Sequence, residues 1–103
     1  MSKRLAFLEK LVAEGKADSF GCYGLALEYR SLGRLEDALA TFSGLRAKDP
    51  DYVPMYLMAG QILAEKGDKA DAIAWLDQGL VVAEKKRDSH AAGEIASLRD
   101  SLV

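Results

Sequence analysis

A 34-residue internal repeat is the feature that most limits how this chain can fold. When the sequence is shifted by 34 residues, residues 19–52 lie over residues 53–86 and four identities cluster. The identities pair Gly33 with Gly67, Asp37 with Asp71, Ala38 with Ala72 and Ala40 with Ala74. A period of this length is typical of stacked supersecondary units, each of which buries its apolar face against its neighbours.

Each copy of the repeat carries the pattern of two amphipathic helices. In the first copy apolar residues recur at spacings of three and four, which predicts helices over 19–32 and 35–48. Gly33 and Gly67 follow the first helix of each copy, where a residue without a Cβ closes a helix at low cost. The first copy therefore predicts a helix hairpin that buries Cys22, Leu25, Ala26, Tyr29 and Leu32 on one helix and Leu35, Ala38, Leu39, Phe42 and Leu45 on the other.

The second copy and the two flanks extend this pattern to six helices. Helices are expected over 53–66 and 69–85, and the segment Asp49-Pro50-Asp51 separates the copies because proline disfavours helix in the residue before it. Asp51 is expected to cap the helix that follows. Apolar stripes in the flanks predict two more helices, over 3–14 and 89–102. The expected fold class is all-α, without strands.

Composition and charge argue against several functions. The chain has 103 residues, half of them apolar, and a net charge of -2, so its overall field does not attract nucleic acid. The most apolar stretch, Val53 to Ala64, is shorter than the roughly 18 residues that a membrane span needs. The N-terminal apolar run, 5–8, is too short for a signal peptide. Cys22 is the single cysteine, so no internal disulfide can form and a cytoplasmic location is expected.

The two copies resemble the tetratricopeptide repeat (TPR) family. Its 34-residue pattern has a Trp, a Leu-Gly pair and a Tyr in the first helix, then Ala-x-x-x-Phe and a closing Pro. Cys22 replaces the Trp, Leu45 replaces a small residue, and Glu84 replaces the Pro of the second copy. The matching residues are Leu25-Ala26, Tyr29, Gly33, Ala38-x-x-x-Phe42 and Pro50, then Tyr56, Ala59-Gly60, Leu63, Gly67, Ala72-x-x-x-Leu76 and Gly79.

The resemblance implies a single domain, a TPR-like α-solenoid of antiparallel helix hairpins with two full repeats and flanking helices. Residues 1–18 would form an N-terminal half-repeat, 19–52 and 53–86 the two repeats, and 87–103 a C-terminal capping helix. Small side chains are needed where helices approach closely. The residues expected at these contacts are Ala26, Gly60, Ala38 and Ala72.

The resemblance also implies where a ligand binds, because the first helices of TPR hairpins line a concave groove. The residues expected to bind a partner there are Tyr23, Leu27, Arg30, Leu57, Met58 and Gln61, with Phe20, Gly24, Pro54 and Ala64 at equivalent positions and His90, Glu94, Ser97 and Asp100 on the last helix. Tyr23, Leu27 and Met58 occupy positions at which some family members have a lysine and asparagine clamp for a C-terminal carboxylate. A ligand with apolar anchors and some positive charge is therefore expected instead.

Two classes of function agree with this pattern. The first is a protein-interaction module that binds a partner peptide or helix in the groove, and the alternative is a structural module that forms a homodimer or a stack of copies. An enzyme is not expected, because His90 is the single histidine and lies far from Cys22 in the sequence. No metal or other cofactor is expected either, since a structural zinc site needs about four ligands.

Overall fold

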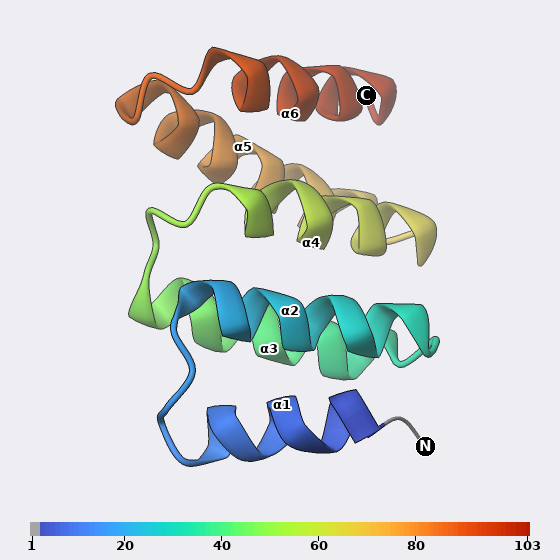
Figure 1. The fold of residues 1–103 in the computed structure, drawn as a ribbon. Coiled ribbons are helices and arrows are strands. Elements are labelled where there is room, and N and C mark those ends of the chain that lie inside the picture. Colours follow the sequence, from blue (N-terminus) through green and yellow to red (C-terminus); the bar gives the residue numbers. More distant parts are fainter. Residues whose placement is uncertain (1–2) are drawn as a thin grey trace. The chain divides into compact units, whose positions relative to one another are not determined.

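The helices lie where the hairpin pattern predicts them. The computed structural model describes residues 3–103, and six helices and no strand occur within that range (Figure 1). All six predicted helices are confirmed, and each boundary lies within one residue of its predicted position. The observed bounds are α1 Lys3–Ala13, α2 Ser19–Ser31, α3 Leu35–Lys48, α4 Pro54–Glu65, α5 Lys69–Lys85 and α6 Ser89–Ser101.

Glycine closes the first helix of each hairpin, as predicted. Gly33 has φ 76° and Gly67 has φ 84°, in the left-handed region where a Cβ would be strained. The backbone N–H of the residue after each glycine donates a hydrogen bond to a carbonyl of the preceding helix. Arg34 donates to the Tyr29 carbonyl at 2.9 Å, and Asp68 donates to the Leu63 carbonyl at 2.8 Å. These bonds satisfy carbonyl groups that the helix end leaves without partners.

Two local predictions were wrong. Leu32 was expected on the buried face of α2, but the helix ends at Ser31, so Leu32 is the C-cap residue and is 46% exposed. Asp51 was expected to cap α4, whose N-cap is Val53 without a side-chain hydrogen bond. Lys85 instead donates to both carboxylate oxygens of Asp51, at 3.1 and 3.2 Å. The following Pro54 has no N–H to satisfy, which lowers the need for a cap.

The chain divides into two compact units, Met1–Asp49 and Pro50–Val103, so the division falls in the segment that separates the repeat copies. In the first unit α2 and α3 form a hairpin and α1 lies against α2 (Figure 1). In the second unit α4 and α5 form the corresponding hairpin, and α6 packs against both of its helices (Figure 1).

Small residues let the hairpin helices approach closely, as predicted. Ala26, Ala38 and Ala72 are fully buried. A Cβ added at Gly60 would lie 2.5 Å from Leu76 Cδ2, a distance that real Cβ contacts do not reach. Packing around these contacts is dominated by large side chains that are also fully buried, namely Phe42, Leu45, Met55, Ile62, Leu76 and Ile95.

None of the helices in residues 3–103 combines the length and the apolar character that crossing a membrane requires.

Candidate functional site

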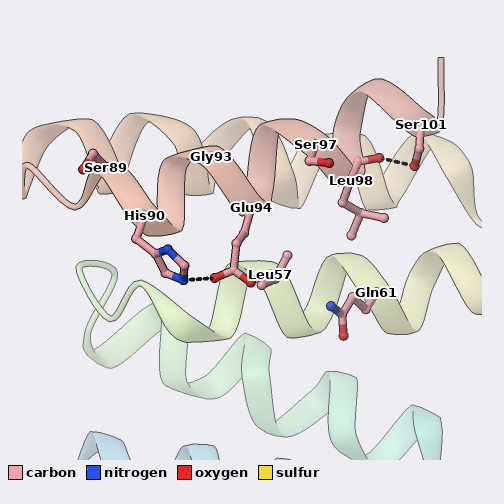
Figure 2. A pocket seen from close by; sticks show the side chains of 9 residues that line it. All are labelled: Leu57, Gln61, Ser89, His90, Gly93, Glu94, Ser97, Leu98 and Ser101. Atoms are coloured by element: carbon pink, nitrogen blue, oxygen red, sulfur yellow. Dashed lines mark hydrogen bonds and ion pairs between the residues drawn. The ribbon is translucent and has the colours of Figure 1, made fainter.

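A groove of about 700 Å³ lies between α4 and α6 in the second unit. Leu57 and Gln61 line it from α4, and His90, Glu94 and Ser97 line it from α6 (Figure 2). All five residues stand at positions where the TPR pattern places the concave face. The structure therefore brings them together on one surface of this unit.

The α4–α6 groove combines a small apolar surface with many polar groups. Leu98 adds a second leucine, and His90 Nε2 lies 3.1 Å from Glu94 Oε1 in an ion-pair geometry (Figure 2). The His90 side chain is 88% exposed and that of Glu94 is 52% exposed, so both are accessible to a ligand. Such a surface can cover an apolar side chain while a carboxylate beside it pairs with a cation.

Leu57 has two roles in this unit. It is half-buried and lines the groove, and it also packs against a core cluster that consists of Val53, Leu76, Ala83 and Ile95. The floor of the groove is thus supported directly by the core. A change at Leu57 is expected to affect both ligand binding and stability.

A second groove, of about 360 Å³, lies between α1 and α2 in the first unit. Arg4 and Leu8 line it from α1, and Phe20, Tyr23 and Leu27 line it from α2. Phe20 is 72% exposed although it is a large apolar residue. At the rim, Arg4 Nε lies 3.2 Å from Glu28 Oε2. Sequence reasoning missed the two α1 residues, and the only signal for them was the likeness of α1 to the second helix of a repeat.

Tyr23 joins the α1–α2 groove to the core of its unit. Its ring centroid lies 6.0 Å from that of the fully buried Phe42, at an interplanar angle of 50°. Burial raises the pKa of the Tyr23 hydroxyl, and the nearby Arg30 partly opposes this. Tyr23 is therefore half-buried, with one part of the ring in the groove and another against α3.

The remaining singled-out residues lie elsewhere. Arg30 and Met58 are half-buried and line neither of these two grooves, and Asp100 is exposed. Cys22 is buried at 4% exposure, in the position that the pattern gives to an aromatic core residue. Within the part of the chain that the structure describes, no three His, Cys, Asp or Glu side chains gather in a way that could hold a metal ion.

A partly buried hydrogen bond joins α1 to α2. Tyr29 OH donates to Glu9 Oε2 at 2.5 Å, and the Arg34 guanidinium lies 4.7 Å from the centroid of the Tyr29 ring. The hydrogen bond to Glu9, followed by burial, raises the pKa of Tyr29 to about 12. The bond holds in place the helix that forms one wall of the α1–α2 groove.

The family to which this arrangement belongs is decided by a match over most of the chain. The tetratricopeptide repeat family matches residues 23–94, which include α2 from its fifth residue, all of α3, α4 and α5, and the start of α6. The chain belongs to the tetratricopeptide repeat family. TPR repeats generally mediate protein–protein interactions, and the family is one of non-catalytic repeat scaffolds.

Solved structures share this TPR fold. A tetratricopeptide repeat domain protein from Salinibacter ruber, determined by solution NMR, is 30% identical with a TM-score of 0.79, over 82% of this chain and 86% of that chain. A crystal structure of a TPR domain protein from the same organism is also 30% identical, with a TM-score of 0.78 over 82% and 96%. A protein from Bordetella parapertussis, 24% identical, has the same fold with a TM-score of 0.83 over 99% and 89%. No curated protein matches the chain.

Proposed function

We propose that this protein is an interaction module that binds a partner peptide through the groove-facing residues of its first-type helices. The observation that supports the proposal best is the α4–α6 groove, where Leu57 and Gln61 line the same opening as Glu94 and Ser97. The TPR family generally uses its repeats for protein–protein interaction, and the lining of this groove suits a peptide better than a small reactive substrate. The first-type helices also carry Tyr23, Leu27, Arg30 and Met58 at positions of this kind.

The chemistry of the α4–α6 groove indicates the kind of peptide. Leu57 and Leu98 offer apolar contact for one anchor side chain. Glu94, half of whose side chain is exposed, offers a carboxylate to a lysine or arginine beside that anchor. The described residues that line this groove include no lysine or arginine to pair with a C-terminal carboxylate, and the imidazole of His90 lies 3.1 Å from the carboxylate of Glu94. An internal peptide segment with an apolar anchor and a neighbouring cation fits best.

Selection from a random peptide library displayed on phage tests this proposal. The purified protein should enrich peptides that pair an apolar residue with lysine or arginine. Glu94→Lys should then weaken the enriched peptides by at least about tenfold, which corresponds to about 1.4 kcal/mol. Leu57→Ala should cost about 2 kcal/mol of binding free energy, as expected for an apolar anchor contact.

Val81→Ser is the control variant. Val81 is 67% exposed on α5 and lines neither groove, so this variant should bind the enriched peptides as the wild type does. Thermal melts of each variant separate lost binding from lost folding, which matters most for Leu57. The proposal would be refuted if the selection enriched no peptide. It would also be refuted if Val81→Ser lost binding while Glu94→Lys bound as the wild type does, because the binding surface would then not be the α4–α6 groove.

A reducing, cytoplasmic location is part of the same proposal. The single cysteine, Cys22, is buried in the core of the first unit, where it serves as a small apolar residue. A fusion to a redox- or compartment-specific fluorescent reporter would measure the location directly. The division into a half-repeat, two repeats and a capping helix stays a prediction.

A further inference from the structure

Two side chains of α6 set the charge of the α4–α6 groove. His90 and Glu94 stand four residues apart and are therefore neighbours on one face of the helix. His90 Nε2 lies 3.1 Å from Glu94 Oε1 (Figure 2). The other described residues that line the groove are leucine, glutamine, glycine and serine, none of which changes charge near neutral pH.

A single proton on His90 cancels the net charge of this lining. Histidine is the side chain that changes charge between about pH 5 and 8, and His90 is the only histidine in the sequence. Carboxylates and the side chains of lysine and arginine keep their charges over most of this range. With a neutral imidazole the lining carries the carboxylate of Glu94 alone, whereas with an imidazolium it carries one charge of each sign.

The helices packed against α6, which are α4 and α5, add no charge to the groove lining. On α4, Tyr56 is buried and donates to the Pro50 carbonyl at 2.6 Å, and Glu65 is exposed; neither lines the groove. The charged residues of α5 and of its connection to α6, none of which lines the groove, are Lys69, Asp71, Asp77, Glu84, Lys85, Lys86, Arg87 and Asp88.

The remaining charged groups of α6 are also outside the lining. Arg99 pairs with Asp77 of α5, and Asp88, the N-cap residue, accepts from the Ala91 N–H at 3.0 Å. Asp100 is exposed and does not line the groove. A pH-dependent change in the charge of the groove therefore comes from His90.

An imidazolium at His90 competes with a peptide cation for the same carboxylate. The side chain of His90 is 88% exposed and that of Glu94 is 52% exposed, so a lysine or arginine of a peptide can reach Glu94 beside the imidazole. When the imidazole is neutral, the carboxylate attracts this cation. When the imidazole is protonated, it pairs with the carboxylate and repels the cation.

We propose that His90 makes the α4–α6 groove release a lysine- or arginine-bearing partner segment as the pH falls from about 8 to about 5.5. The inference rests on the function proposed above and adds the regulation of that same site. Linkage between two ligands is reciprocal, so a proton that weakens peptide binding is itself expelled when the peptide binds.

Calorimetric titration of the full chain tests the inference. The probe is the peptide that the library selection enriches most strongly at about pH 8, chosen without histidine or cysteine and blocked at both ends so that its own charge stays constant. Its dissociation constant should be about three- to fivefold higher at about pH 5.5, the scale of an exposed ion pair. A probe with glutamine in place of its cation should bind with one affinity at both pH values. Titrations near pH 6.5, in two buffers with different heats of ionisation, should show proton release.

Three variants make the test specific. His90→Gln should bind the probe with one affinity at both pH values, because an amide gains no proton, and His90→Lys, a permanent cation, should bind it weakly at both. Lys86→Gln is the matched control, since Lys86 is exposed and does not line the groove, and it should keep the pH dependence of the wild type. Thermal melts at both pH values separate pH-dependent binding from pH-dependent folding.

Several results would overturn the inference and leave the groove as the binding surface. They are equal affinity of the wild type at both pH values, a pH dependence that His90→Gln retains, and a pH dependence that the neutral probe shares. Unfolding of the wild type at the lower pH would also overturn it, because the loss of binding would then come from the loss of the fold. A selection that enriches no peptide would instead refute the proposed function, and this inference with it.

Discussion

Gly79 is the position where a single added methyl group tests the close packing of α4 and α5. A Cβ placed there would lie 2.5 Å from Tyr56 Cβ, 3.1 Å from Tyr56 Cγ and 3.2 Å from Ile95 Cδ1. Because Tyr56 Cβ is attached to the backbone, rotation of the tyrosine side chain cannot relieve the clash. Gly79→Ala must therefore displace α4 or α5. The displacement would disturb the core, because Tyr56 is 2% and Ile95 0% exposed.

Two opposed effects set the magnitude of this change. Overpacking of a well-filled core costs about 1–3 kcal/mol. Alanine in place of glycine inside a helix recovers about 0.5–1 kcal/mol. Because the clash is with an atom attached to the backbone, the upper half of the overpacking range applies, and Gly79→Ala should lower the free energy of unfolding by about 1–2.5 kcal/mol. Gly93→Ala in α6 is the matched control, since nothing lies within 4 Å of its Cβ position, and it should raise the free energy of unfolding by about 0.5–1 kcal/mol.

Urea unfolding followed by tryptophan fluorescence measures both variants. Trp75 is the only tryptophan, is 8% exposed in the second unit, and its ring centroid lies 5.9 Å from that of Tyr56, so its emission reports the packing in question. Far-ultraviolet circular dichroism gives the melting temperature, which should move by about 4–8 °C per kcal/mol for a chain of this size. The close packing would be refuted if Gly79→Ala unfolded at the same urea concentration as the wild type while Gly93→Ala was more stable. That result would show that α4 and α5 do not approach as closely as described.

Two further predictions concern the core and a titrating group. Ala72 is fully buried on α5, so Ala72→Leu should cost about 1–3 kcal/mol, and a melting temperature equal to that of the wild type would contradict the close contact. Tyr29 has a folded pKa of about 12 against 10.0 in the unfolded chain, so its contribution to stability is complete below about pH 10 and is lost as the pH rises through about 12. Glu9→Gln keeps an acceptor but removes the charge, so tyrosinate absorbance of this variant should show Tyr29 ionising at lower pH, and an unchanged titration would contradict the role of Glu9.

The fold could be predicted because the repeat itself marks where the first helix of each hairpin ends. Gly33 and Gly67 recur 34 residues apart and both adopt the left-handed conformation that ends a first helix. Their spacing fixes the hairpins, and the apolar periodicity fixes which faces are buried. Asp51 shows where this local reasoning ends, because its carboxylate pairs with Lys85, 34 residues away, rather than with the next helix. A capping rule cannot account for such a competing long-range partner.

The candidate sites were predictable in part. The positions of Leu57 and Gln61 followed from the register of α4, and those of His90 and Glu94 from the periodicity of α6. The contribution of α1 to a groove could not be predicted from residue identities, since Arg4 stands where the repeats have a small residue. Only the three-dimensional packing of α1 on α2 shows that Arg4 and Leu8 lie beside Phe20.

The two grooves show how one repeat geometry can present different chemistry. The helices α2 and α6 both begin with serine, Ser19 and Ser89, and the residues that line the two grooves fall at matching positions along them. At three of these positions α2 carries an aromatic or aliphatic group where α6 has an imidazole, no side chain or a hydroxyl, in the pairs Phe20 and His90, Tyr23 and Gly93, Leu27 and Ser97. At a fourth the order is reversed, since Glu28 of α2 matches Leu98 of α6. Both helices are 13 residues long, and each has an aspartate N-cap whose side chain accepts from a backbone N–H. The side chains that line each groove differ, so the two grooves suit ligands of different polarity.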